Sequence, residues 1–410
     1  MTDAPVPPTP GRCPIDLAPD YAPPLSYAEG RPDDRPLCPV RLPSGDQVTM
    51  ATRYEDVLVV LQNPVFSREL GYPGAPRVVD AADVHHDPDA LINMDPPRHT
   101  RLRKLVSGAF TPRRLQAWQP RVESITEELV EEFGSGPAPA DLVSGFSFVL
   151  PVRVICALLG VPADDHEQFR RWTTAFLSTT AFTARDRAVA REEFAGYHWS
   201  LIQYRREHPG DSLIDALISA ADDRGSLTEP ELVRLTMSLI VAGHGTTANL
   251  LTRAVFTLLV SGGYARLAAD PARIPAAAEE LLRREMPVDG GLRVALEDVE
   301  LPSGPVRKGE VVLPAITIAN RDPAVYPAPE RFDIDRYAAG EDTEAARGHL
   351  AFGQGAHYCV GAGLARQEVQ VALETLTRRL PGLRLAVPAP EVPWTEGMIV
   401  QGITELPVTW

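Results

Sequence analysis

A single cysteine in a glycine-rich segment is the first candidate for chemistry in this sequence. The stretch from Phe352 to Gly361 places three glycines around Cys359, and a helix-like run follows it at once. Glycines permit tight turns that would strain a residue with a Cβ, and the beginning of a helix carries partial positive charge. Both features stabilise a thiolate, which is a ready metal ligand. The alternative is an inert cysteine buried in a turn.

Zinc is the rival metal for such a sulfur ligand. Structural zinc sites use four protein ligands, commonly supplied by Cys-x-x-Cys pairs. The four cysteines, at positions 13, 38, 156 and 359, are widely spaced and form no such pair. The ligand count therefore argues against zinc. The same spacing indicates no disulfide framework and fits a reducing compartment.

A long apolar segment carries the second group with chemical potential. Thr228 and Glu231 have the spacing of a capping box, and Pro230 suits a first helical turn. The apolar run that follows continues to about Val260 and stops at Gly262-Gly263. This pattern predicts a helix of roughly 30 residues, ~45 Å long at 1.5 Å per residue. A helix this long and apolar must cross the core of the protein.

The middle of that helix, Ala242 to Thr247, contains two glycines and two threonines where larger apolar residues would pack better. Each glycine costs about 1 kcal/mol relative to alanine in a helix, so a compensating use is expected. Small residues let a flat cofactor and a substrate approach the backbone, and Thr246 can present its hydroxyl group locally. The alternative is a close helix–helix contact.

A third segment begins with Asp95-Pro96-Pro97, which is typical of a helix start. His99 and Arg103 are four residues apart and therefore share one helical face. They are either surface charges or partners for an anionic group, to which arginine can bind through two parallel hydrogen bonds. Arg101 and Lys104 lie on a different face and are either solvated charges or part of a docking patch for an acidic partner.

These segments, in this order, resemble the cytochrome P-450 family of heme-thiolate monooxygenases. The resemblance implies heme b, iron protoporphyrin IX, as the cofactor and Cys359 as the axial ligand of its iron. His99, Arg103, Arg293 and His357 would then anchor the heme propionates. The residues that resemble the family's heme-binding loop are Phe352, Gly353, Gly355, His357, Cys359 and Gly361.

The central turn of the long helix resembles the oxygen-binding groove of that family, in which an acid followed by threonine organises protons for dioxygen activation. Thr246 matches the threonine and is the candidate catalytic residue, but Gly245 stands where the acid is expected. Protons must then come through water, another side chain or the substrate, so oxidative coupling or ring formation gains weight over hydroxylation. Candidate substrate contacts are Val241, Ala242, Gly291, Leu292 and Ile399.

Other segments carry structural expectations. The resemblance implies that Glu280 and Arg283 form a buried ion pair joined by Arg331. The paired glycines at 290–291 are expected to widen a substrate cavity, and the apolar run from Val311 to Ile318 predicts a strand. Further expectations are a site-covering loop over 71–88 with solvated His85 and His86, a helix over 364–380, and a hairpin over 398–402.

Length, composition and charge bound the fold and the partners. With 410 residues, the chain is long enough for one large domain or two ordinary ones. We expect a mainly α fold with a small β region, forming a cytochrome P-450-like single heme-thiolate domain over 43–410 after an irregular arm over 1–42. A net charge of −15 argues against nucleic-acid partners and anionic membrane surfaces. No apolar run spans a membrane and no signal pattern opens the chain, so we expect a cytoplasmic protein.

The function implied by the resemblance is oxidation of a small organic substrate, of the kind made in secondary metabolite biosynthesis, by a monooxygenase. The absence of a flavin-binding extension implies that a separate ferredoxin and ferredoxin reductase supply the electrons. Two alternatives remain open. One is a peroxide-driven enzyme of the same fold, and the other is a non-enzymatic heme or gas-binding protein.

Overall fold

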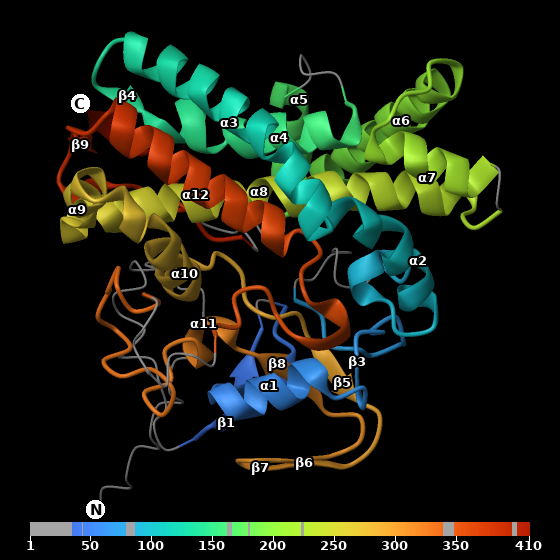
Figure 1. The fold of residues 1–410 in the computed structure, drawn as a ribbon. Helices are drawn as coiled ribbons and strands as arrows, with labels where there is room; N and C mark the ends of the chain where they lie inside the picture. The colour runs from blue at the N-terminus through green and yellow to red at the C-terminus, as the bar shows by residue number, and fades with distance from the viewer. Residues whose placement is uncertain are drawn as a thin grey trace, which may run out of the picture.

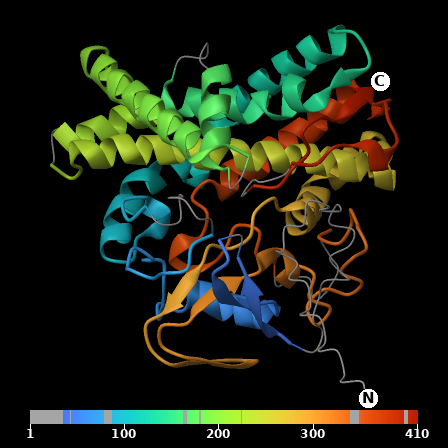
Figure 2. The same cartoon turned by 180° about the vertical axis from the view of Figure 1, so that it is seen from behind.

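The computed structural model divides into a large helical part and a smaller part that contains the main sheet (Figures 1 and 2). The residues that the structure describes are 35–42, 44–78, 87–161, 166–178, 181–222, 225–338, 348–395 and 400–410. The long helices gather on one side of the molecule, and the five-stranded sheet lies on the other. The prediction of a mainly helical chain with a small β region is confirmed.

The helices from α2 to α10 follow one another closely, whereas longer segments separate α1, α11 and α12 from their neighbours in the chain. Their bounds are α1 (Tyr54–Gln62), α2 (Arg98–Ser107), α3 (Pro112–Ser135), α4 (Val149–Leu159), α5 (His166–Phe176), α6 (Ala184–Glu207), α7 (Leu213–Asp222), α8 (Glu229–Ser261), α9 (Gly263–Ala269), α10 (Ile274–Glu285), α11 (Ile316–Ala319) and α12 (Ala362–Arg379).

The strands form three small sheets. The largest has the order β1-β2-β8-β5-β3, in which β2 and β8 are parallel and the other pairs are antiparallel. A second sheet has the order β4-β10-β9, and β6 and β7 form a hairpin. The bounds are β1 (Leu37–Arg41), β2 (Gln47–Ala51), β3 (Phe66–Ser67), β4 (Ala140–Asp141), β5 (Arg293–Ala295), β6 (Val299–Leu301), β7 (Gly304–Val306), β8 (Val311–Pro314), β9 (Arg384–Leu385) and β10 (Pro407–Thr409).

Two of the predicted boundaries need correction. Strand β1 occupies the last residues that we assigned to the irregular arm, where the sequence also suggests a short strand from Cys38 to Leu42, and it pairs with β2 along its whole length. Residues 1–34 of that arm lie outside the described chain. The predicted strand over Val311–Ile318 ends at Pro314, because proline has no N–H group with which to continue a ladder. The chain turns there into α11, where Asp289 accepts hydrogen bonds from the N–H and hydroxyl groups of Thr317 at 2.8 and 2.7 Å.

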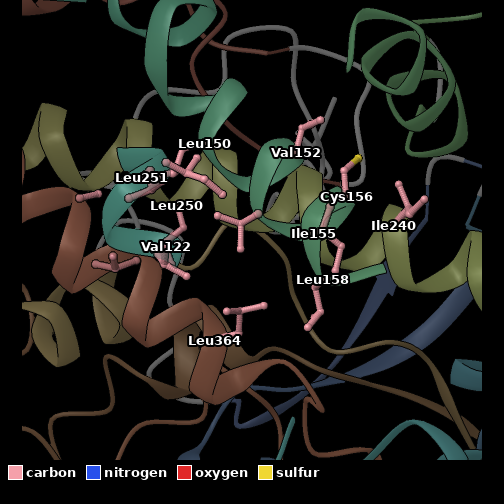
Figure 3. Packing of buried hydrophobic residues seen from close by; sticks show 14 of the residues in the cluster. Val122, Leu150, Val152, Ile155, Cys156, Leu158, Ile240, Leu250, Leu251 and Leu364 are labelled. Carbon is pink, nitrogen blue, oxygen red and sulfur yellow. The ribbon is translucent and has the colours of Figure 1, made fainter. Parts of the chain in front are cut away.

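Helix α8 is the long core helix that the sequence predicts. Thr228 and Glu231 form the capping box in both directions, and Gly262 ends the helix with a left-handed φ of 72°. Its apolar side chains are enclosed by α4, α3 and α12, as Figure 3 shows for Ile240, Leu250 and Leu251. Because α8 is packed on several sides, its central turn is held in a fixed place relative to the elements around it. No helix in the described residues is apolar over enough length to cross a bilayer.

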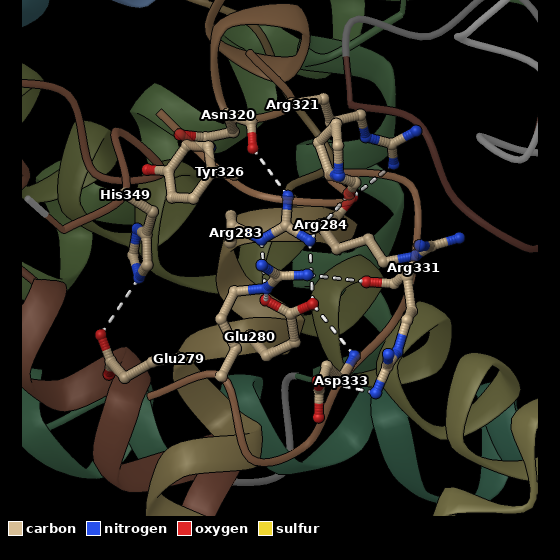
Figure 4. A network of polar contacts seen from close by, with 12 residues as sticks. Glu279, Glu280, Arg283, Arg284, Asn320, Arg321, Tyr326, Arg331, Asp333 and His349 are labelled. Carbon is tan, nitrogen blue, oxygen red and sulfur yellow. Dashed lines mark hydrogen bonds and ion pairs between the residues drawn. The ribbon is translucent and has the colours of Figure 1, made fainter. Parts of the chain in front are cut away.

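A buried ion network joins α10 to the segment that precedes the cysteine loop (Figure 4). Glu280 accepts hydrogen bonds from Arg283 at 2.7 and 2.8 Å, and both side chains are fully buried, as expected. The third member is Arg336, whose Nε lies 3.0 Å from a Glu280 oxygen. The expectation for Arg331 was wrong. Its side chain is 71% exposed and pairs with Asp333 at the surface.

This network predicts different stabilities for two arginine variants. Arg336→Ala should lower the free energy of unfolding by about 2 kcal/mol or more, because it removes a buried partner of a buried carboxylate. Arg331→Ala, the matched control five residues earlier, should change it by no more than about 0.5 kcal/mol, because its ion pair is exposed. Denaturant unfolding of both variants measures the difference. Equal losses would contradict the assignment of Arg336 to the network.

Candidate active site

The loop before α12 has the tight backbone that its glycines predict. Gly353 and Gly355 have φ values of 69° and 71°, which residues with a Cβ rarely adopt. A Cβ on Gly355 would lie 2.5 Å from the carbonyl oxygen of Leu61 in α1. The N–H of Cys359 donates to the carbonyl of Phe352 at 2.9 Å. The loop is therefore closed on itself and packed against the sheet side of the molecule, which fixes the position of the cysteine sulfur.

The Cys359 thiol is accessible to solvent but closely surrounded by protein. Burial is the largest influence and raises its pKa, while the Gly361 N–H and the charges of Arg103 and Arg366 lower it. The predicted thiolate-stabilising groups are thus present, but in the protein alone they do not outweigh burial. In the described part of the chain no cluster of three or more His, Cys, Asp or Glu side chains is placed to hold a metal ion.

Four side chains from three separate segments of the chain come together beside this loop. The rings of His99 and His357 lie 4.3 Å apart between centroids. The Arg103 guanidinium donates to the carbonyl of Tyr358, next to the cysteine. Arg293 is buried at the start of β5 and donates to the carbonyl of Gly291 at 2.8 Å. Helix α2, strand β5 and the loop before α12 therefore bring these side chains to one place.

The electrostatics of this region are strongly positive. Burial, followed by the charges of Arg293, His99, Arg68 and Arg103, lowers the pKa of His357 to about 2. Burial and Arg68 also lower the pKa of Arg293. The lowered pKa values of His357 and Arg293 show that further positive charge is disfavoured here. His357 and His99, whose pKa is also lowered by burial, are therefore neutral at pH 7, and a bound negative charge would be stabilised.

These residues fit heme b. A single sulfur can ligate the iron, and the excess of buried positive charge fits the two propionate carboxylates, because arginine binds carboxylates through paired hydrogen bonds. Asp95 is the acid whose charge acts on both Arg293 and His99. The arginine charge beside the loop therefore favours the binding of further anionic groups.

The central turn of α8 presents its small residues to solvent although the rest of the helix is mostly buried. Ala242 is exposed, and Gly243 and Thr246 are partly exposed. The Thr246 hydroxyl donates to the carbonyl of Ala242 at 2.7 Å, and the Asn249 amide donates to the carbonyl of Gly245 at 2.7 Å. The Thr246 oxygen therefore keeps its lone pairs for a hydrogen-bond donor in the groove. The sequence reasoning did not single out Asn249.

Helix α5 packs directly on this turn. The Thr173 hydroxyl and Nδ1 of His244 lie 2.9 Å apart in a buried hydrogen bond. Leu177 directly follows the end of α5, and a Cβ on Gly245 would lie 2.9 Å from its Cδ1 atom. Leu177 thus occupies the space beside the position where an acid was expected. Burial lowers the pKa of His244 to about 4, so the imidazole is neutral and links two helices.

The substrate residues proposed from sequence have mixed placements. Ala242 is exposed in the groove, whereas the side chains of Val241 and Leu292 are 9% and 2% exposed. The expectation that Gly290 and Gly291 widen a cavity was wrong. A Cβ at the first would lie 2.7 Å from the carbonyl of Pro314, and a Cβ at the second 2.1 Å from the Arg68 guanidinium, so both glycines admit close packing. Ile399, His85 and His86 lie outside the described residues.

A helical fold with an accessible cysteine beside a cluster of arginine and histidine side chains, and with small residues exposed on a core helix, fits the class of enzymes that hold a flat anionic metal cofactor. Comparisons with known proteins agree. The family model for cytochrome P-450 matches residues 274–382. Mycinamicin IV hydroxylase/epoxidase of Micromonospora griseorubida is 43% identical over 382 residues, covering 92% of this chain and 93% of that protein.

Two further proteins extend the comparison. Nocardicin C N-oxygenase of Nocardia uniformis subsp. tsuyamanensis is 42% identical, and the match covers 97% of this chain and 96% of that protein. A crystal structure of a cytochrome P-450 with biaryl coupling reactivity has a TM-score of 0.85 and 34% identity, covering 97% of this chain and 99% of its own. This chain belongs to the cytochrome P-450 family. It is an oxidoreductase that binds heme b through a cysteine thiolate.

The geometry predicts which cysteine is the ligand. Cys359→Ala should abolish the red-shifted absorption band that a thiolate-ligated, reduced heme shows under carbon monoxide, because no other described cysteine lies in the loop. Cys156→Ala is the matched control, since that side chain is buried in α4 and should leave the band in place. Retention of the band in the Cys359 variant would contradict the assignment.

Proposed function

We propose that this protein is a monooxygenase that oxidises a small organic molecule in secondary metabolite biosynthesis. The observation that carries the proposal is that His99, Arg103, Arg293 and His357 gather beside the loop of Cys359. The accessible small residues in the central turn of α8 add to it. Relatives named as a hydroxylase/epoxidase and as an N-oxygenase support the substrate class.

Heme b with a thiolate ligand supplies the activation of dioxygen. In this proposal Cys359 holds the iron, while Phe352 and Gly353 shape the loop around the ligand. Arg103 and Arg293 bind the propionates through charged hydrogen bonds. His99 and His357 are neutral at pH 7, because burial and the neighbouring cations lower their pKa values, and so donate neutral hydrogen bonds.

Thr246 is the residue that we propose to act in proton handling. Its hydroxyl proton is directed to the carbonyl of Ala242, so its oxygen accepts a hydrogen bond from a water molecule or a substrate hydroxyl in the groove. Gly245 brings no carboxylate, and the apolar Leu177 stands beside it. We therefore infer that a proton comes from water or from an N–H or O–H group of the substrate, which favours coupling or cyclisation over simple hydroxylation. The related structure with biaryl coupling reactivity supports this choice.

The surface where α3 and α12 lie side by side is the region that we propose to bind a ferredoxin as the electron donor. A groove of about 300 Å³ lies between them, with Leu115, Arg366 and Glu374 among its lining residues. Arg113 and Arg114 are exposed just before it, on a chain whose net charge is −15. An acidic partner would be attracted to this local positive charge. Arg101, considered above for the same role, pairs with Glu231 of α8 and donates to the carbonyl of Ser226.

The proposed electron route predicts the response to two oxidant systems. With a ferredoxin, its reductase and NADPH, a substrate that shifts the heme spin state should be turned over. Hydrogen peroxide alone should give little product. Candidate substrates come from binding-difference spectra with aromatic, peptide-derived and polyketide compounds. Turnover with peroxide only would favour the peroxide-driven alternative, and the lack of any spin-state shift across the panel would favour a non-enzymatic heme protein.

The missing acid predicts a change in product distribution. Gly245→Asp combined with Leu177→Ala should raise the ratio of hydroxylated to coupled product, because the smaller residue makes room for a carboxylate beside Thr246. Gly245→Asn with the same Leu177 change is the matched control, since its side chain has a similar size but does not ionise. Mass spectrometry of the products gives the ratio. An unchanged ratio in the aspartate variant would remove the reason for favouring coupling.

A further inference from the structure

One carboxylate on α10, that of Glu279, is connected to the segment around Cys359 at several points. Nε and Nη2 of Arg366 in α12 donate to its two oxygens at 2.7 and 3.1 Å. Nε2 of His349 lies 3.1 Å from one of these oxygens, as Figure 4 shows. These three side chains, the Glu279 cluster, join α10 and α12 to the chain just before the cysteine loop. The site described above does not use Glu279 or His349.

His349 links the Glu279 cluster to the start of the loop. Its Nδ1 atom accepts a hydrogen bond from the backbone N–H of Ala351 at 3.2 Å. Since Nδ1 is an acceptor there, Nε2 carries the ring proton and donates it to Glu279. The imidazole thus connects the carboxylate to the backbone one residue before Phe352.

Arg366 links the cluster to the middle and the end of the loop. Its guanidinium carbon lies 4.6 Å from the centre of the Phe352 ring, a distance at which a cation is attracted to an aromatic face. Its Nη1 atom also donates to the hydroxyl of Tyr358 at 3.3 Å. The Phe352 carbonyl accepts from the N–H of Cys359, and Tyr358 directly precedes Cys359. Arg366 therefore contacts both residues that fix the cysteine backbone.

The charges of the Glu279 cluster keep these contacts in place at neutral pH. Burial raises the pKa of Glu279, but hydrogen bonds from His349 and Arg366 outweigh it and lower the pKa to about 2. The carboxylate is therefore ionised at pH 7, and its two oxygens hold the planar guanidinium in one orientation. Without this carboxylate, the guanidinium would be free to turn away from the Phe352 ring.

We propose that Glu279 is a positioning residue for the sulfur ligand. Through Arg366 and His349 it holds the cysteine loop in the form that keeps Cys359 on the heme iron. This inference rests on the proposed assignment of Cys359 as that ligand. Groups beyond the direct ligands orient a ligating side chain and strengthen its bond to the metal. A purely structural role would affect the sulfur only when the whole fold is lost, whereas a positioning role affects it earlier.

The test follows the red-shifted absorption band of the reduced, carbon monoxide-bound holoprotein during incubation at a raised temperature, with far-UV circular dichroism of the same samples. In Glu279→Gln the band should decay about tenfold faster than in the parent while the helical signal persists, as expected for the loss of a charged hydrogen bond. Glu285→Gln is the matched control, because this buried carboxylate on the same helix binds Arg253 and Thr257. Its band should decay only together with the helical signal.

Two further variants separate the position of Arg366 from its charge. Arg366→Lys keeps the positive charge but loses the planar fork that binds both oxygens and lies over the ring. It should therefore lose the band early, as Glu279→Gln does. The double variant should decay no faster than the faster of the two single variants, because both changes break the same contacts. Parent-like persistence of the band in Arg366→Lys, or additive effects in the double variant, would overturn the proposal.

Band decay in Glu279→Gln that is no faster than in the parent would overturn it as well. If that variant yields no holoprotein, Glu279→Asp replaces it, since a carboxylate one methylene shorter should not bind Arg366 and His349 together. Band loss no earlier than loss of helix in Glu279→Asp would then have the same meaning. The ligand assignment fails separately, if the parent lacks the red-shifted band or if Cys359→Ala keeps it.

Discussion

Buried positive charge beside one sulfur atom is the constraint on which the rest of this structure depends. Arg68, Arg103 and Arg293 are drawn together with Asp95 in a region where water cannot solvate them fully. Such an arrangement favours the binding of an anion between the cations. The heme of this family carries the required carboxylates, so cofactor and fold stabilise each other.

Much of the framework could be predicted because it is encoded locally. The capping box of Thr228 and Glu231, the glycine that ends α8 and the prolines before α2 act over three or four residues, and both helices have these boundaries close to the expected positions. The tight turns of the cysteine loop were equally readable, since glycine is the residue that the observed positive φ values require. The pairing of His99 with His357 followed from the family resemblance rather than from spacing.

The errors and omissions concern contacts between residues far apart in sequence. Arg331 and Arg336 are both plausible partners for Glu280, and only the path of the intervening turn decides which one points inward. Gly290 and Gly291 suggested open space, but their neighbours are Pro314 and Arg68, the latter 223 positions away from Gly291 along the chain. Leu177 and Asn249 are ordinary residues in helical patterns. No periodicity or spacing distinguishes them from other residues on the same helices.

The contact between α5 and α8 has a consequence for how molecules are selected. Any displacement of α5 from α8 would separate Thr173 from His244, and so leave a buried imidazole nitrogen without its hydroxyl partner. Lifting the same helix withdraws Leu177 from Gly245 and changes the wall beside Thr246. The position of α5 and the surroundings of Thr246 are therefore coupled through these two contacts. If binding of a ligand displaces α5, the ligand's affinity then includes the free energy of breaking these contacts as well as its own contacts with the protein.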